Sequence, residues 1–521
     1  MKVYFVSCQF NPYCNHLLMR PAKPFSLLLL LCTFLVCPAQ EDKHDYIWLF
    51  GYYPNISQDS FGGSMLNFHT EPKEITYFDM PPNFVFWPVS TISNKSGELV
   101  LYTNGCTIVN REHEVMLNGD TINAGHVYDS YCSFGYPYTQ GIITLPQPDA
   151  DSIYYLFHIR YNSQLVVTDL LYSIVNANGD NGLGEVIEKD VLLLQDTFAD
   201  QIQAVRHGNG RDWWLVAPKS GSNIHYLFLL SPQGLEGPFE QQAGAVWNHY
   251  NWSGQAIFSP DGRKYIRVNP FNGIHIYDFD RCTGELSNPL SLEFVGDTIY
   301  STTGAGVSVS PNNRYLYVSL STRFYQYDLW ASDIGASRQL IAAYDGFLSP
   351  FPTTFFQHML APDGKIYITA TNGVNRLHVI HNPNEPGLAC NLEQHGIRLP
   401  AFHVVSAPNF PHFRLYDLSG SPCDTLGIST ASEEPEQEPF SISVYPNPAS
   451  SQVVVQISVA LAHRAGILFQ LYNGVGQLMQ ERSLLEQQTK IDLDGLPPGA
   501  YFWKVKSANN LPIGQGKLIV H

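Results

Sequence analysis

Charged residues are scarce in this chain of 521 residues, and basic residues are the scarcer kind. Asp, Glu, Lys and Arg together make up 14% of the chain, and 46 acidic against 29 basic side chains give a net charge of −17. A nucleic-acid partner would require a basic face. The sequence contains no cluster of Lys and Arg that supplies one, so we exclude nucleic-acid binding.

A long apolar segment is also missing. The apolar run Phe25 to Val36 is shorter than the roughly 20 residues that span a bilayer, which argues against a membrane anchor. It follows the basic stretch 19–23 and precedes the small residue Ala39, an order typical of a cleaved secretory signal. We expect residues 1–39 to be a signal peptide with its true start at Met19, so membrane passage is transient.

Cysteine is sparse beyond the signal. Five cysteines remain there, Cys106, Cys132, Cys282, Cys390 and Cys423, and their spacing does not resemble a zinc site. Export permits disulfides, and an odd count leaves at least one cysteine unpaired within the chain. No Gly-rich phosphate loop follows a strand and opens a helix. We expect neither a metal nor another cofactor.

Turn-forming and aromatic residues are abundant instead, with 40 Gly, 35 Pro, 30 Tyr and 30 Phe. The turn Ser259–Gly262 precedes the strand-like run 263–268, and similar pairs begin at Ser310 and Ala361, with their prolines 51 residues apart. Pro suits the second position of a tight turn, Asp or Asn the third and Gly the fourth, and β-branched and aromatic residues favour strands. A fixed period near 50 indicates a repeat architecture.

Seven such units can be counted. Their turn markers fall at positions 45, 97, 151, 210, 262, 313 and 364, spaced 51 to 59 residues apart. The sixth unit shows four expected strands, at 306–309, 315–320, 324–329 and 339–344. Four strands per unit predict a seven-bladed β-propeller over residues 40–426. The alternative is a stack of open β-repeats or a pair of sandwiches.

The first unit opens on a second strand, at Tyr46, with no first strand before it. We expect Phe402–Pro408 to supply that strand and latch the ring. The Ser-Pro-Asp-Gly turns resemble those of TolB-like and other exported bacterial propellers. This resemblance concerns the architecture only and does not identify any catalytic residues in this chain.

The composition changes after Cys423. Residues 427–439 are acidic and contain Pro, as in an extended linker. Residues 440–521 contain expected strands at 443–445, 452–457, 468–472, 501–505 and 517–520, which predict a small Ig-like β-sandwich. An ordinary adhesion-type sandwich is the alternative to the more specific interpretation that follows.

Four motifs occur in order up to the C-terminus: Tyr445–Ala449, Leu471–Gln477, Leu496–Tyr501 and Gly516–Val520. Together they resemble the type A C-terminal sorting domain of the type IX secretion system, a family of the Bacteroidota. The resemblance implies periplasmic export, interaction with the type IX secretion machinery, and an extracellular or outer-membrane surface location. The sorting motif then consists of Tyr445, Pro446, Asn447, Pro448, Gly499, Tyr501, Gly516 and Lys517.

Ligand candidates are expected on one face of the ring. The connections between blades and the loops between second and third strands share a face, and here the connections are long and aromatic. Aromatic, Asn and His side chains around a funnel could stack on sugars or grip a peptide, although we favour the interpretation that they pack between blades and fill the channel. The candidate ligand-binding residues are Trp87, Tyr128, Tyr131, Trp247, His249, Trp252 and Phe351.

The expected position of loops on this face also allows predictions for the cysteines and the acidic residues. Cys106 and Cys132 both fall there, so we predict a disulfide between them, and Cys390 with Cys423 could pin the closing segment. The loop acids Asp129, Asp297 and Asp345 could serve a hydrolase, but solvated loop acids are commoner. His378 and His381 point to opposite faces of a predicted strand, which makes a shared metal improbable.

We therefore predict a secreted or surface-displayed binding module for a glycan or protein. The alternative is an extracellular propeller hydrolase or lyase that acts on polysaccharide or peptide, and a third possibility is a structural surface component. The Ser-Pro-Asp-Gly turns are interpreted as scaffold, which directs the search for a ligand to the opposite, aromatic face.

Overall fold

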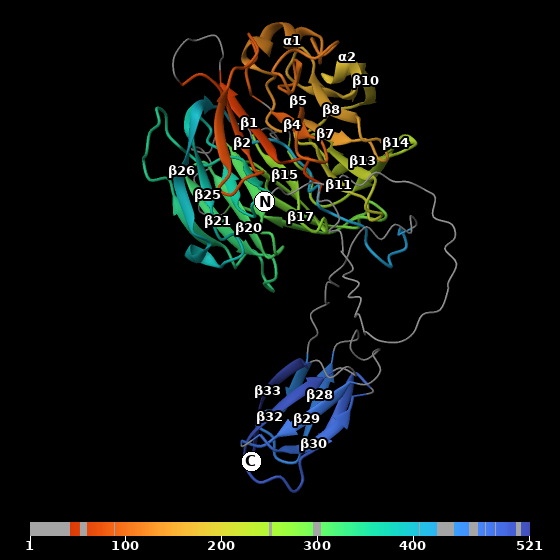
Figure 1. Ribbon diagram of the computed structural model, residues 1–521, viewed down its shortest axis with the longest axis vertical. Coiled ribbons are helices and arrows are strands. Elements are labelled where there is room, and N and C mark those ends of the chain that lie inside the picture. Colours follow the sequence, from red (N-terminus) through yellow and green to blue (C-terminus); the bar gives the residue numbers. More distant parts are fainter. Residues whose placement is uncertain are drawn as a thin grey trace, which may run out of the picture.

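The computed structural model describes residues 42–52, 60–87, 89–248, 253–294, 304–405, 407–424, 442–457, 467–474, 476–484, 486–506 and 512–521. The predicted signal peptide and the predicted linker 427–439 lie outside these residues. Figure 1 shows the sheets following one another in chain order from red to cyan, with the C-terminal strands in blue.

The described residues between 47 and 403 form seven antiparallel sheets, which we call blades one to seven. Blade one contains β1 (Ile47–Tyr52), β2 (Gly62–Asn67) and β3 (Glu74–Phe78), and blade two contains β4 (Ser90–Ser93), β5 (Leu99–Thr103) and β6 (Ile108–Asn110). Blade three contains β7 (Ile142–Pro146), β8 (Ile153–Tyr161), β9 (Val167–Asn176) and β10 (Glu185–Gln195). Blade four contains β11 (Gln203–Arg206), β12 (Trp213–Pro218), β13 (Ile224–Ser231) and β14 (Gly234–Gln242).

Blade five contains β15 (Gln255–Phe258), β16 (Lys264–Asn269), β17 (Gly273–Phe279) and β18 (Leu286–Leu292). Blade six contains β19 (Ala305–Val309), β20 (Tyr315–Leu320), β21 (Arg323–Asp328) and β22 (Gln339–Ala343). Blade seven contains β23 (His358–Leu360), β24 (Ile366–Ile368), β25 (Val374–Ile380) and β26 (Leu392–His403). Because β26 also contacts β1 and β2 of blade one, the ring closes as a seven-bladed propeller. The predicted fold class is confirmed.

The repeated turn has a reproducible hydrogen-bond pattern. In blade five, the Gly262 amide donates to the Ser259 carbonyl at 2.8 Å, and the Lys264 amide donates to Ser259 Oγ at 2.9 Å. Gly262 has φ +71°, and Asn313 takes the equivalent position of blade six at φ 61°. Asn is among the few residues with a side chain that tolerate this left-handed region. The turn of blade six can therefore form with Asn in place of Gly.

The expected first strand of blade one is not formed. Phe402 and His403 are the last residues of β26, and blade one keeps three strands. Residues 407–424, which we call the closing segment, pass into the centre of the ring instead. Arg414 forms a bidentate ion pair with Asp45 at 2.6 and 2.8 Å, which ties the closing segment to the chain just before β1. The latch therefore exists, but side chains and not a strand ladder make it.

Buried glutamines explain this route. Gln140, Gln203, Gln255 and Gln357 lie at or just before the innermost strands of four blades and are at most 3% exposed. Buried amides must find partners, and Asn409 of the closing segment provides one for two of the four, Gln140 and Gln203. It accepts from Gln140 and Gln203, each at 3.0 Å, and donates to the carbonyls of Ile142 and Ile202 at 2.9 and 3.1 Å. The channel is filled by these polar side chains.

Two disulfides are present. Cys106 pairs with Cys132, as predicted. Cys423 pairs with Cys282, not with Cys390, which is buried and free. The prediction for Cys390 was wrong because the closing segment leaves the ring beside blades four and five, where the Leu418 amide donates to the Gly208 carbonyl at 2.7 Å. The second disulfide fixes the end of the closing segment.

The C-terminal strands form a two-sheet sandwich. One sheet contains β27 (Ile442–Tyr445), β28 (Gln452–Ile457) and β31 (Gln488–Asp492), and the other contains β30 (Leu478–Ser483), β29 (Leu468–Tyr472), β32 (Gly499–Lys506) and β33 (Pro512–Val520). Their inner faces share a core that includes Val455, Phe469, Ile491 and Trp503. The polar strands β30 and β31 were not expected from the sequence. No helix in the described part of the chain is long and apolar enough to cross a membrane.

Candidate binding pocket and sorting domain

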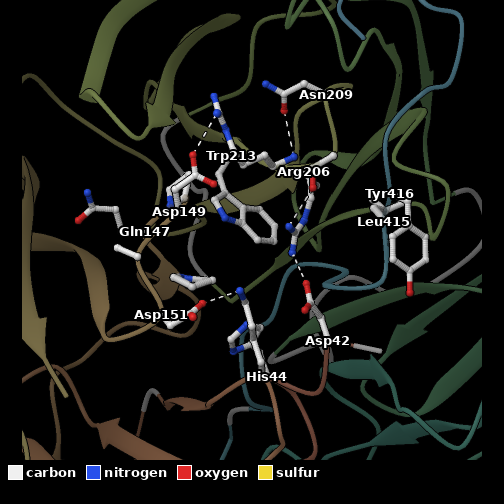
Figure 2. A pocket seen from close by; sticks show the side chains of 16 residues that line it. Asp42, His44, Gln147, Asp149, Asp151, Arg206, Asn209, Trp213, Leu415 and Tyr416 are labelled. Atoms are coloured by element: carbon white, nitrogen blue, oxygen red, sulfur yellow. Dashed lines mark hydrogen bonds and ion pairs between the residues drawn. The ribbon is translucent and has the colours of Figure 1, made fainter. Parts of the chain in front are cut away.

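The face that carries the Ser-Pro-Asp-Gly turns, which we call the turn face, has a pocket of about 350 Å³. Its walls come from the segment before β1, the first-to-second strand turns of blades two, three and four, and the closing segment. Two further hollows of about 600 and 640 Å³ also lie beside such turns. Hollows therefore occur on the turn face, while ligand binding on the aromatic face stays a prediction. Figure 2 shows the turn-face pocket.

Three ion pairs surround the turn-face pocket. Arg206 binds Asp42 at 2.9 Å, Arg211 binds Asp149 at 3.1 Å, and Lys95 binds Asp151 at 2.5 Å. Each pair joins residues from different blades or from the segment before β1. Hydrogen bonding to Lys95 lowers the pKa of the Asp151 carboxyl from its usual value. Acidic and basic side chains therefore lie next to each other around the pocket.

Arg206 organises the inner wall of the pocket. Its guanidinium lies 4.3 Å from the centre of the Trp213 ring and donates to the carbonyls of Gly210 at 3.0 Å and Phe413 at 3.2 Å. Burial lowers the pKa of this guanidinium, while the neighbouring Asp42 opposes that effect. Figure 2 shows Arg206 beside Trp213 and directed toward Asp42. Because Arg206 and Phe413 cover the indole, Trp213 offers no open ring face to a ligand.

His44 lies at the bottom of the pocket and is nearly inaccessible. Its Nδ1 lies 2.6 Å from the Ser93 carbonyl, a contact in which only the nitrogen can donate. The other ring nitrogen can then accept. Burial lowers the pKa of His44, so the ring is neutral at physiological pH. Pro146, Pro148 and Leu415 complete an apolar part of the lining.

The predicted aromatic site is not assembled as a unit. Trp87 and Phe351 are exposed, whereas Tyr128 and Tyr131 are half-buried beside the core. Trp247 is buried against the Arg267 guanidinium, 3.8 Å from its ring centre, so it cannot stack on a ligand in this structure. His249 and Trp252 lie outside the described residues. Other aromatic residues of these connections pack in the core, namely Phe84, Phe86, Tyr136, Tyr138, Phe355 and Phe356.

The loop acids and histidines are likewise scattered. Asp129 is exposed in α1 (His126–Tyr131), Asp345 accepts from His395 at 2.9 Å, and Asp297 lies outside the described residues. His378 is buried, and His381 bonds Glu393 at 2.8 Å. Among the described residues no group of three or more His, Cys, Asp or Glu side chains is placed to hold a metal ion.

The turn-face pocket was missed because its residues come from three blades, the segment before β1 and the closing segment. Asp149 and Asp151 are part of a recognised turn in the sequence, but nothing local indicates that Arg211 and Lys95 reach them across blade boundaries. A search by motif cannot detect such a site.

The sorting-motif residues hold the last strand of the sandwich in place. Asn447 accepts from the Ile519 amide at 2.9 Å and donates to the Lys517 carbonyl at 2.8 Å. Pro446 and Pro448 flank it, and the exposed Tyr445 precedes them. A side chain at Gly516 would clash with the Trp503 indole, since its Cβ would lie 2.5 Å from the ring.

Tyr501 anchors the preceding strand. Its hydroxyl donates to the Pro497 carbonyl at 2.8 Å, and its ring is buried in the sandwich core. Gly499 begins the same strand, β32. The motif thus consists mainly of residues that fix the C-terminal strand against its neighbours, with Lys517 exposed.

Comparison with known proteins agrees with this part of the chain. Residues 443–521 match the family described as the Secretion system C-terminal sorting domain. The C-terminal sandwich is thus a type IX sorting domain, carried by an exported β-propeller cargo. The protein is exported to the cell surface or the extracellular space. No curated protein matches the chain.

Solved structures with a similar fold come from several bacteria. A proposed 6-phosphogluconolactonase from Bacteroides fragilis is 13% identical, with 70% of this chain and 98% of that chain covered and a TM-score of 0.43. PorZ of Porphyromonas gingivalis, described as an essential surface component of the type-IX secretion system, is 12% identical, with 88% and 63% covered and a TM-score of 0.34. At these identities and TM-scores, the likenesses assign no function to this chain.

Proposed function

We propose that the propeller is a non-enzymatic binding module and that its turn-face pocket takes an extended peptide segment of a protein ligand. The observation that best supports this proposal is the set of three ion pairs around a partly apolar pocket on the turn face. We further infer that a cleaved signal peptide delivers the chain to the periplasm of a member of the Bacteroidota before type IX export.

Binding without catalysis fits the pocket's charges. General acid–base catalysis works best with a group whose pKa lies near the operating pH. The hydrogen bond from Lys95 lowers the pKa of the Asp151 carboxyl, which moves it further from that range. The pocket lining contains no Ser, Thr or Cys that could act as a nucleophile.

A peptide suits the lining better than a sugar. Sugar recognition commonly uses an open aromatic face, and the Trp213 ring is covered by Arg206 and Phe413. A peptide instead offers carbonyls, amides and mixed charges, which paired Arg, Lys and Asp side chains can bind at the pocket rim. The prolines and Leu415 provide contacts for an apolar side chain.

The closing segment already illustrates such binding. It runs beside the pocket, where Arg206 donates to the Phe413 carbonyl at 3.2 Å and Arg281 donates to the Tyr416 carbonyl at 2.6 Å. The same face therefore holds one extended chain through arginine contacts to its backbone. The pocket presents further arginine and lysine donors next to it.

Selection from a displayed dodecapeptide library on the full-length secreted protein tests the proposal. Binding of a recovered peptide is measured by calorimetry, and the peptide is examined by mass spectrometry after incubation. We expect Arg211→Gln to weaken binding by roughly tenfold, the effect of losing one charge-assisted hydrogen bond. The matched control Arg314→Gln breaks an ion pair with Asp328 on blade six and should leave affinity unchanged.

Two outcomes would overturn the proposal. Cleavage of the peptide during incubation would identify an enzyme. Binding of an immobilised glycan that is lost in Trp87→Ala or Phe351→Ala, but kept in Arg211→Gln, would move the site to the aromatic face.

A further inference from the structure

A second polar site is buried between blades four and five, away from the turn-face pocket. Arg267 and Tyr265 project from one side of β16, opposite His275 and Tyr277 in the paired strand β17. His225 of β13 faces them from blade four, with its ring centre 5.2 Å from that of Tyr277 and 6.1 Å from that of Tyr265. Trp247 covers Arg267 from the connection between the two blades.

Unpartnered polar atoms are concentrated in this gap. Both ring nitrogens of His225 lack a hydrogen-bond partner, as do Arg267 Nε, Trp247 Nε1, and the hydroxyls of Tyr265 and Tyr277. All of these side chains are at most 6% exposed. Buried polar groups are nearly always satisfied, and a cluster of exceptions indicates an ion, a ligand or water between them.

The cluster is rich in donors and has an uncompensated positive charge. The Arg and Trp nitrogens can only donate, and Tyr and His can donate as well. The one hydrogen bond of the Arg267 guanidinium among the described residues goes to Gln201 Oε1, at 3.4 Å. By contrast, Arg206 pairs with Asp42, and Arg281 donates to the carbonyls of Arg206, His207 and Tyr416.

The nearest acid does not neutralise Arg267 fully. Asp200 is close enough to interact with it electrostatically, but no described carboxylate lies within ion-pair distance. Burial raises the pKa of Asp200 to about 7, although its hydrogen bond from Thr139 opposes the shift. Below neutral pH this carboxyl is largely protonated. A buried cation without a counter-charge is strongly unfavourable.

We propose that the gap between blades four and five is a binding site for one small monovalent anion of about the size of chloride. Arg267 supplies the counter-charge, and Trp247, Tyr265, Tyr277 and His225 supply hydrogen-bond donors. These side chains are nearly inaccessible to solvent, which favours a small ligand over a large one. The site is independent of the proposed peptide pocket.

The pH dependence follows from the groups that face Arg267. These are Asp200, His225, His275, Tyr265 and Tyr277. Burial lowers the pKa of His225 to about 3 and that of His275 to about 4, and it raises the pKa of both tyrosines. Between pH 5 and 9 only Asp200 among them changes charge. Anion affinity should therefore fall, by roughly tenfold or more, as the pH rises through 7 and Asp200 ionises.

Crystals of the full-length protein soaked in sodium bromide provide the direct test. We expect a bromine anomalous peak within hydrogen-bond distance of Arg267 and Trp247 at pH 5.5, and a weaker one at pH 8.5. An ordered water molecule at that position without an anomalous signal would overturn the proposal. A peak elsewhere only would do the same and would indicate an adventitious ion only.

A solution measurement complements the crystal. Replacing gluconate by chloride at constant ionic strength should raise the melting temperature of the wild type at pH 6 by a few °C, since a bound anion stabilises the folded state. Arg267→Met should abolish this difference, while Arg314→Met, at an exposed ion pair, should keep it. If Arg267→Met does not fold, the absence of a chloride effect on the wild type still refutes the site.

Discussion

Asn409→Ala should destabilise the propeller by about 3 kcal/mol, because Asn409 links the closing segment to the channel. The residue is buried, and its amide makes four hydrogen bonds. Those to the Ile142 and Ile202 carbonyls contribute about 1 kcal/mol each. Gln140 and Gln203 also donate to the Ala256 carbonyl, at 2.7 and 3.3 Å, so each retains a partner and its loss is smaller, about 0.5 kcal/mol.

Urea denaturation followed by tryptophan fluorescence measures this change. Asn178→Ala, at an exposed position between β9 and β10, is the matched control and should shift the free energy of unfolding by less than about 0.5 kcal/mol. If Asn409→Ala changes the stability no more than the control does, the closing segment does not hold the ring together through these contacts. A loss well above 3 kcal/mol would mean that neighbouring contacts of the segment are released as well.

Three further predictions follow from the same structure. Replacing both Cys282 and Cys423 by Ser should cost about 4 kcal/mol, because their disulfide closes a loop of 141 residues; an unchanged urea midpoint would contradict this. Burial lowers the pKa of His358 and His378 to about 3, so these rings stay neutral in the fold while the unfolded chain binds protons below pH 6.5. The contribution of the two neutral rings to the free energy of unfolding is complete above pH 6.5. It is lost as the pH falls toward 3, by up to about 1.4 kcal/mol per pH unit for each ring. Urea midpoints that stay constant from pH 6.5 to 4 would refute it. Asn447→Ala should destabilise the sorting domain by about 2 kcal/mol, through loss of two hydrogen bonds to the last strand, as measured by hydrogen exchange at Ile519; unchanged exchange would exclude that role.

The repeating parts of the fold could be predicted because their information is local. Pro260, Asp261 and Gly262 specify a turn whatever surrounds them, and the runs that follow are strand-like in composition. The expected strand 315–320 is identical to β20, and 452–457 is identical to β28. The disulfide between Cys106 and Cys132 followed from placing two connections on one face.

The centre of the ring could not be predicted because its contacts are non-local. Residues 402–408 have an apolar sequence that suits a strand, but hydrogen bonds between buried glutamines of three blades and the residues Ala407 and Asn409 determine the path of the chain. The disulfide between Cys423 and Cys282 could not be predicted for the same reason, because the path of the closing segment brings the two residues together. The strand β30 lacks the alternation that identifies a strand, because most of its residues are exposed, and β31 is short with a single apolar residue, Ile491.

The candidate site could likewise be predicted only in part, because its contacts are also non-local. Trp87 and Phe351 are exposed as a loop argument suggests, yet Trp247 fills space against Arg267. The sequence alone does not distinguish a loop aromatic residue that packs into the core from one that is exposed to solvent. The turn-face pocket depends on ion pairs such as that between Lys95 and Asp151, 56 residues apart, which no local pattern reveals.

The most direct test of the account is calorimetric titration of the full-length secreted protein with a peptide selected on it, alongside Arg211→Gln and Arg314→Gln. The account predicts saturable binding that weakens about tenfold in Arg211→Gln only, with the peptide recovered intact. Equal affinity in both variants, or a cleaved peptide, would contradict the claim that this exported propeller binds protein ligands at its turn face.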